Sequence, residues 1–287
     1  ASTGSHEAVE LRDGEMNRWM GKGVEGAVTN VVERIQDALV GLPVDNQRVL
    51  DEIMIELDDT GNKASLGANA TLGTSLACLH AASNVHQLPL WRYLGGISGG
   101  SLPGPMMNIL NGGAHAASNV DVQEFMVIPV SANSISEAIR MGCEVFHSLK
   151  DLLRKNGLAT AVGDEGGFAP ALKDTNDALD YILEAIETAH YAPGQDFLLA
   201  LDCASSEYFD GEKYNLEGED LKLNQEQNIQ YLIDLQEKYP IVSIEDGMAE
   251  DDWTGWTSLT AKTGSRCQLV GDDLFATNPK RLMDGIQ

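Results

Sequence analysis

FLLALD at residues 197–202 is an apolar run that ends in an acidic residue, and the chain repeats this pattern twice further on. IVSIE at 241–245 ends in Glu245, and QLVGD at 268–272 ends in Asp272. Short runs without polar alternation are typical of strands that are buried on both faces, as in a parallel sheet. The chain between these runs is long enough for a helix each time. This alternation predicts an α/β fold in which helices cover a parallel sheet, either open or closed into a barrel.

The same rhythm begins earlier in the chain, with two apolar runs close together at 106–110 and 124–129. They bring the expected strands to five. The first hundred residues instead carry apolar residues at helical spacing, and the Gly-rich, uncharged stretch 95–104 is the best candidate for a linker. We therefore expect two domains, a mostly helical one at 1–100 and an α/β one at 101–287.

Composition excludes several classes of protein. The 287 residues are 43% hydrophobic, which is enough for a large core, and 19 Lys and Arg against 44 Asp and Glu give a net charge of −25. Such a surface repels nucleic acid and anionic lipid. The sequence shows no apolar run of the roughly 20 residues that span a bilayer. The four cysteines form no C-x-x-C pair and lie in apolar stretches, which indicates reduced thiols and a cytoplasmic location.

Each of the three apolar runs at 197–202, 241–245 and 268–272 ends in an acidic residue. These residues are Asp202, Glu245 and Asp272. The carboxyl ends of parallel strands share one face of a sheet or barrel, so these side chains are expected to converge. Converging carboxylates repel one another unless a cation lies between them, and an all-oxygen set without Cys or His favours Mg²⁺ over Zn²⁺. The alternative for each acid alone is a helix cap or a pair with a surface lysine.

Glycine-rich segments present further polar groups. GDEGG at 163–167 places Glu165 between glycines in an expected loop, and NGGAH at 111–115 places His115 directly after an expected strand. Seen alone, each has an ordinary structural explanation: a turn with an incidental acid, and a histidine that forms loop hydrogen bonds. No Walker loop, dinucleotide-binding glycine motif or G-x-S-x-G elbow is present.

Taken together, the segments resemble the enolase family, the phosphopyruvate hydratases, and the sequence is most similar to the bacterial type. The resemblance covers essentially the whole chain. It is carried by ASTG at 1–4, NGGAHA at 111–116, QEFM at 123–126, GDEGG at 163–167, LDCASSE at 201–207, PIVSIED at 240–246 and VGDDLFATNP at 270–279.

The resemblance implies a small N-terminal α+β domain and a (β/α)8 barrel with a ββαα start. It also implies the reversible dehydration of 2-phosphoglycerate to phosphoenolpyruvate in glycolysis, with two Mg²⁺ ions per active site. The substrate is a small phosphorylated three-carbon acid. The family forms dimers or octamers in the cytoplasm, and display at the cell surface or secretion is the alternative location.

Carried over residue by residue, the resemblance makes Asp202, Glu245 and Asp272 the ligands of the first Mg²⁺. Ser2 lies on the loop that helps bind the second. Because proton removal next to a carboxylate produces a dianionic intermediate, such cations are needed to spread its charge. The enolase superfamily is itself the usual example of a Lys or His base that works together with one or two Mg²⁺ ions.

By the same resemblance, Glu165 acts as the general acid that protonates the departing hydroxyl, with Glu124 supporting it. His115 and Gln123 contact the substrate as loops close. The implied catalytic set comprises Glu165, Glu124 and His115, and the implied substrate-binding set comprises His115, Gln123, Glu124, Glu245 and Asp272.

The chain departs from the family pattern at both ends. The family's first hairpin would precede Ala1, and no lysine here, Lys280 included, stands where the family places its base. The resemblance therefore implies the acid and metal half of an enolase site, with about five of the barrel strands.

Two other functions remain open from the sequence. A racemase or cycloisomerase of the same superfamily would use the same three acids, but the segments at 111–115 and 163–167 argue against it. A non-catalytic surface or interaction protein derived from an enolase would carry exposed lysine clusters, and this acid-rich sequence shows none.

Overall fold

The computed structural model describes residues 4–113, 119–163 and 166–287. These residues form two compact units, His6–Ser101 and Leu102–Gln287, the second of which also includes residues 4–5. The linker expected at 95–104 spans the boundary between the two units.

The unit His6–Ser101 is built from helices in the part of the chain that is described. In chain order its elements are η1 (Trp19–Gly21), α1 (Glu25–Asn30), η2 (Val31–Ile35), α2 (Gln36–Leu39), α3 (Gln47–Asp58), α4 (Ala68–Val85) and α5 (Leu90–Gly95). The segments α1, η2 and α2 follow one another without a break, as the helical spacing predicts, and η2 is one turn of π-helix. The core of the unit contains Ala27, Ile35, Met54, Leu66 and Ala70.

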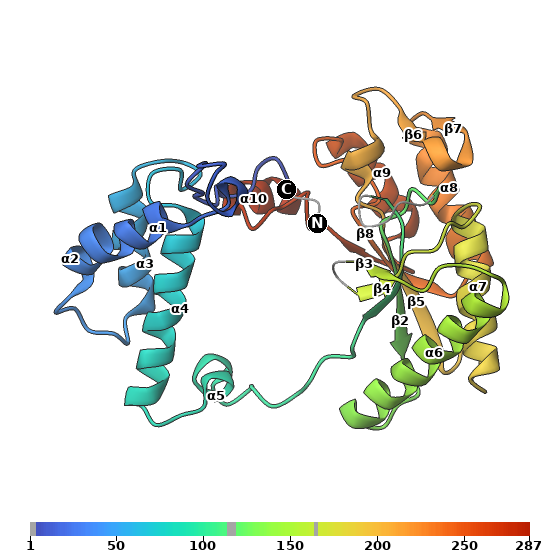
Figure 1. Cartoon of the computed structure of the whole chain (residues 1–287), viewed down its shortest axis with the longest axis horizontal. Helices are drawn as coiled ribbons and strands as arrows, with labels where there is room; N and C mark the ends of the chain where they lie inside the picture. Colours follow the sequence, from blue (N-terminus) through green and yellow to red (C-terminus); the bar gives the residue numbers. More distant parts are fainter. Residues whose placement is uncertain (1–3, 114–118, 164–165) are drawn as a thin grey trace. The chain divides into compact units, whose positions relative to one another are not determined.

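The unit that contains Leu102–Gln287 alternates strands and helices (Figure 1). Its strands are β1 (Met107–Asn111), β2 (Glu124–Pro129), β3 (Val162–Gly163), β4 (Gly166–Phe168), β5 (Phe197–Asp202), β6 (Tyr214–Leu216), β7 (Leu221–Leu223), β8 (Ile241–Glu245) and β9 (Gln268–Val270). Its helices are α6 (Ile135–Lys155), α7 (Thr175–Thr188), η4 (Ser205–Tyr208), η5 (Glu217–Glu219), α8 (Gln225–Lys238), α9 (Trp253–Thr263) and α10 (Pro279–Ile286).

Seven strands form one mixed sheet in the order β3-β4-β1-β2-β5-β8-β9. The strands β5, β8 and β9 are parallel, as predicted from their apolar runs. By contrast, β2 is antiparallel to both β1 and β5. The sheet is mostly parallel in the sense that five of its seven described strands, β1, β4, β5, β8 and β9, run in one direction. It begins with two adjacent antiparallel strands followed by α6, which is the start that the enolase-type barrel implies.

The sheet has more strands than the five that the apolar runs predict. The two additional strands, β3 and β4, form a short antiparallel hairpin in a segment that the glycines of 163–167 led us to expect as a loop. The apolar residues of these strands are Val162, which is exposed, and Phe168, which is buried in the core and pairs with Leu110 of β1. Pairing with a distant strand, rather than local propensity, makes this segment extended.

The helices of this unit pack their apolar faces on the strands. Leu149 and Leu153 of α6, Ile182 of α7 and Leu232 of α8 are at most 1% exposed and belong to one core with the strand residue Phe125. In Figure 1, α6, α7 and α8 lie around the outer side of the strands. At the carboxyl ends of β5 and β8, Asp202 and Glu245 are only half-buried.

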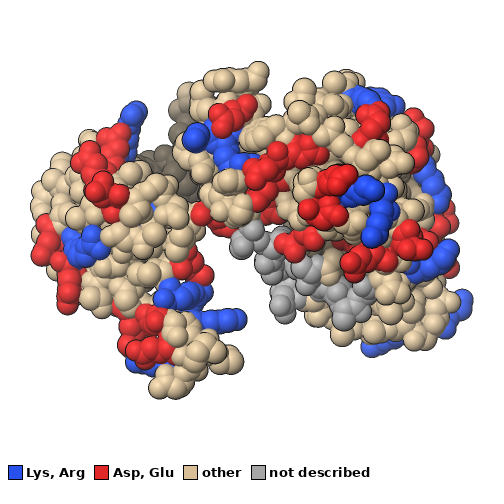
Figure 2. Space-filling model, turned by 90° about the horizontal axis from the view of Figure 1, so that it is seen from above, with Lys and Arg blue, Asp and Glu red and all other residues tan. Residues whose placement is uncertain are grey.

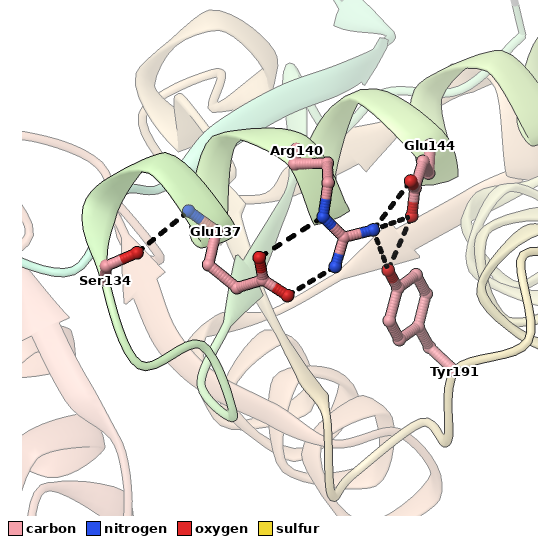
Figure 3. Close-up of polar contacts among 5 residues, drawn as sticks. All are labelled: Ser134, Glu137, Arg140, Glu144 and Tyr191. Atoms are coloured by element: carbon pink, nitrogen blue, oxygen red, sulfur yellow. Dashed lines mark hydrogen bonds and ion pairs between the residues drawn. The ribbon is translucent and has the colours of Figure 1, made fainter.

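A charged network fixes the first turns of α6 (Figure 3). The hydroxyl of Ser134 accepts a bond from the backbone N–H of Glu137 at 3.2 Å and so caps the first turn of the helix. Arg140 pairs with Glu137 and, at 2.7 Å, with Glu144, and it also donates to the Tyr191 hydroxyl at 3.2 Å. The pKa of Glu137 is lowered by its bond from Arg140, and that of Glu144 by its bonds from Tyr191 and Arg140. The network ties α6 to the loop that follows α7.

On the face of the protein that Figure 2 shows, the described residues form no large basic area. Asp and Glu side chains are spread over this face, and Lys and Arg side chains are interspersed among them. This distribution agrees with the net charge of −25 and disfavours nucleic acid as a partner. Across the described residues, no helix combines the length and the apolar character that crossing a membrane requires.

Candidate active site and metal centre

The ends of three parallel strands bring acidic residues to one edge of the sheet. Asp202 of β5 lies directly opposite Glu245 of β8, and Glu245 lies opposite Val270, the last residue of β9. Asp272 follows β9 by two residues. The register therefore places all three predicted metal ligands at the same end of the sheet, because parallel strands that pair in register also end together.

Two of these residues, Asp202 and Glu245, form with Asp246 a cluster of carboxylates that is tight enough to hold a metal ion. One oxygen from each of Asp202, Glu245 and Asp246 lies within 4.8 Å of the others. Asp272 is exposed at the edge of this cluster and is near enough to raise the pKa of Glu245. The third member, Asp246, is not one of the residues that the sequence pattern predicts.

The electrostatics of the cluster indicate a place for positive charge. Burial raises the pKa of Asp202 to about 6, against the bonds from the backbone of Ala204 and from Gln123, which lower it. Burial raises the pKa of Glu245 to about 7, and the charges of Asp202, Asp272 and Glu124 add to this effect. No Lys or Arg among the described residues forms an ion pair with Asp202 or Glu245. A divalent cation would remove this repulsion, and carboxylate oxygens are the ligands that Mg²⁺ prefers.

Two polar residues reach the cluster because β2 runs in the opposite direction. Its first residue, Glu124, pairs with Asp202, the last residue of β5. The preceding residue, Gln123, is 4% exposed and donates its side-chain amide to Asp202 at 3.2 Å. The antiparallel strand thus places the beginning of β2 beside the end of β5. Both residues were predicted from the resemblance to lie at the site.

Asn111, the last residue of β1, is fully buried and joins the end of β1 to β4. Its side-chain amide donates to the carbonyl oxygens of Gly166 at 2.5 Å and Gly167 at 3.1 Å, and it accepts a bond from Asn108 at 2.7 Å. These bonds fix the two glycines that follow Glu165 in the chain. Asn111 belongs to a quoted motif, but nothing in the sequence indicated this contact.

Gly112 is required where the loop passes close to the segment before β2. A Cβ atom at this position would come within 2.3 Å of the Val122 carbonyl oxygen and 2.5 Å of the Val120 carbonyl oxygen. The backbone N–H of Gly112 donates to Gln123 at 2.9 Å, and that of Gly113 donates to Val120 at 2.7 Å. The glycines of this motif therefore let two backbone segments approach each other next to Gln123.

Three of the predicted site residues, Ser2, His115 and Glu165, lie outside the residues that the structure describes. Their roles stay predictions from the resemblance. Asp246 and Asn111 are the residues near the site that sequence reasoning missed. The only sequence signal for Asp246 is its position directly after Glu245.

The raised pKa values predict how Mg²⁺ binding depends on pH. Below about pH 7 the folded protein holds protons on Glu245 and then on Asp202, and Mg²⁺ must displace them. We expect the affinity for Mg²⁺ to fall on the order of 100-fold from about pH 8 to about pH 5.5, because each displaced proton costs about tenfold per pH unit below the pKa. Titration calorimetry with Mg²⁺ at the two pH values measures this change.

The metal-free protein should show the opposite trend. A carboxyl group whose pKa is raised on folding contributes stability below its ordinary pKa, and this contribution is lost as pH rises through the folded value of about 6 or 7. Thermal unfolding without metal should therefore show that the contribution of this site to the free energy of unfolding decreases as the pH rises from about 4.5 to about 8. A Mg²⁺ affinity that is independent of pH would contradict the placement of the cation among these carboxylates.

Comparison with known protein families matches nearly the whole chain. Residues 1–94 match the family described as Enolase, N-terminal domain, and residues 100–287 match Enolase, C-terminal TIM barrel domain. The two matches follow the same order as the two domains in the chain, and they support a lyase-type activity. With the mixed sheet and its acidic edge, they show that the chain belongs to the enolase family.

Proposed function

We propose that the protein catalyses the reversible, Mg²⁺-dependent dehydration of 2-phosphoglycerate to phosphoenolpyruvate. The observation that carries the proposal is the convergence of Asp202 and Glu245, with Asp272 beside them, at the carboxyl ends of parallel strands in a chain of the enolase family. The pKa values of Asp202 and Glu245 are raised because burial and neighbouring negative charges disfavour their ionised forms. A bound cation would stabilise those forms, so the raised values support a metal site.

In this proposal Asp202, Glu245 and Asp272 hold the first Mg²⁺, and Ser2 contributes to the second. When bound, Mg²⁺ supplies positive charge beside the substrate carboxylate, where negative charge increases after proton removal. Gln123 helps to orient Asp202 through its amide, which donates at 3.2 Å. The half-buried Glu124 lies across the strand pair from Asp202, which supports its assignment near the reacting groups.

Glu165 is proposed as the general acid and His115 as a substrate contact. To expel hydroxide, a carboxylic acid must hold its proton near neutral pH, and acidic neighbours with partial burial favour that form. The surroundings of Asp202 and Glu245 already have this character. Asn111, through its bonds to Gly166 and Gly167, fixes the two residues that follow Glu165 in the chain.

The family resemblance extends the proposal to the setting of the reaction. We place it in glycolysis and gluconeogenesis in the cytoplasm, with a small phosphorylated three-carbon acid as the substrate and a homodimer or octamer as the assembly. The acidic surface supports a small-molecule substrate over nucleic acid, since it would repel a polyanion.

The proposal predicts formation of phosphoenolpyruvate from 2-phosphoglycerate. The assay uses the natural gene product that contains residues 1–287 and follows the ultraviolet absorbance of the enol phosphate with and without Mg²⁺. Turnover should require Mg²⁺ and stop when a chelator is added. Turnover of a carboxylate racemisation substrate in place of 2-phosphoglycerate would instead support the alternative within the superfamily.

A further inference from the structure

Asp246 occupies an unusual position next to the acidic cluster. It directly follows Glu245 at the end of β8, it is 2% exposed, and its backbone φ is 41°. A residue other than glycine seldom adopts this left-handed conformation, and such residues persist only where the surrounding structure holds them. The turn at Asp246 therefore needs an explanation in the contacts of this residue.

Those contacts connect the ends of three strands. The carboxylate of Asp246 accepts the backbone N–H of Asp273 at 2.8 Å and that of Leu274 at 3.4 Å. Its own backbone N–H donates to Val270 at 2.9 Å, and its carbonyl oxygen accepts from Ser205 at 3.1 Å. One residue thus bonds to the chain just beyond β5, to the last residue of β9 and to the segment after β9.

The segment after β9 carries Asp272. Val270 and Asp273 flank this residue in the chain, and Asp246 bonds to both of them. The Arg281 guanidinium also donates to the carbonyl oxygen of Leu274, but the bonds from Asp246 are the ones that reach both sides of Asp272 from the end of β8. Although Asp246 belongs to the cluster by distance, its oxygens face the backbone of this segment and its side chain is buried, unlike the half-buried Asp202 and Glu245.

We propose that Asp246 is a positioning residue that holds Asp272 beside Asp202 and Glu245 and thereby sets the affinity of the site for Mg²⁺. This inference rests on the Mg²⁺ site of the proposed function. Its physical basis is that a ligand carboxylate on a loop must be held in place before the ion binds, or part of the binding free energy is used to order the loop.

Two variants of Asp246 test the inference. Asp246→Ala removes both acceptors and should weaken Mg²⁺ binding roughly 10–100-fold, the range typical of residues that orient metal ligands. Asp246→Asn keeps the shape and one acceptor oxygen, so its affinity should lie between those of the Ala variant and the parent. The probe is Mg²⁺ alone in titration calorimetry with the full 287-residue chain, and circular dichroism checks that each variant is folded.

Amide hydrogen exchange separates positioning from direct ligation. Without metal, the backbone amides of Asp273 and Leu274 should exchange roughly tenfold faster in Asp246→Ala, the factor expected when one hydrogen bond is lost. If Asp246 were only a ligand, the affinity for Mg²⁺ would fall while these amides kept their protection. If the Ala variant does not fold, the isosteric Asn variant decides between the two results.

The matched control is Asp196→Ala. Asp196 also accepts a backbone N–H, that of Ala192 at 2.8 Å, but it lies immediately before β5, at the opposite end of that strand from Asp202. Its loss should leave the affinity for Mg²⁺ unchanged. If the Asp246 variants bind Mg²⁺ as tightly as the parent, the inference is wrong although the metal site stands. If the parent itself binds no Mg²⁺, the proposed metal site fails instead.

Discussion

Replacing Glu165 by glutamine should lower the rate of 2-phosphoglycerate dehydration by roughly 10²–10⁴-fold, the usual contribution of a general acid. Glutamine has the shape of glutamate but cannot give a proton to the departing hydroxyl. The affinity for Mg²⁺ should change little, because the predicted ligands of the first ion are Asp202, Glu245 and Asp272. The measurement is the ultraviolet absorbance of phosphoenolpyruvate formed by the natural gene product, with Mg²⁺ binding followed in parallel by calorimetry.

The control for this variant is Glu187→Gln, which makes the same chemical change at an exposed position of α7. It should retain the full rate. Near-normal turnover by Glu165→Gln would overturn the role assigned to this residue and leave Glu124, at the start of β2, as the next candidate for the acid.

Replacing Glu245 by glutamine should have two effects of opposite sign. Binding of Mg²⁺ should weaken by more than about 100-fold, beyond the roughly 10–100-fold that is typical for residues that only orient a ligand. At about pH 8 the metal-free protein should become more stable, because burial and the charges of Asp202 and Asp272 disfavour the ionised form of Glu245. Since Glu245 is partly open to solvent, the gain should be on the order of 1 kcal/mol, or about 2–4 °C in melting temperature.

Thermal unfolding with and without Mg²⁺ measures both effects together. For the parent, Mg²⁺ at about 100 times its dissociation constant adds about 2.7 kcal/mol, which corresponds to a rise of roughly 5–10 °C. For Glu245→Gln this rise should disappear. Glu237→Gln, at an exposed position of α8, is the matched control and should keep the full rise. A variant of Glu245 that becomes less stable without metal would argue that its carboxylate has a structural partner instead.

Much of the architecture can be predicted from short segments of sequence. The runs at 197–202 and 241–245 are mainly apolar at successive positions, and most of their residues are buried, as parallel strands of a helix-covered sheet require. The shorter run at 268–272 also forms a parallel strand, although its residues are only partly buried or exposed. Ser134 and Asn224 begin helices because their side chains accept the free N–H groups of a first turn. These features depend on neighbours within a few residues, so the sequence contains what is needed to predict them.

The tertiary structure alone decided which of these segments meet, and in which direction. Nothing local makes β2 antiparallel to β5, yet only that direction brings Gln123 and Glu124 to the carboxylates. Asp246 has a left-handed backbone conformation that is unfavourable by itself. Its hydrogen bonds to residues 24 to 41 positions away in the chain stabilise this conformation. The residue types of the site are therefore predictable from the sequence, because carboxylates at strand ends imply a cation. Their contacts are not, because they depend on pairing between distant strands.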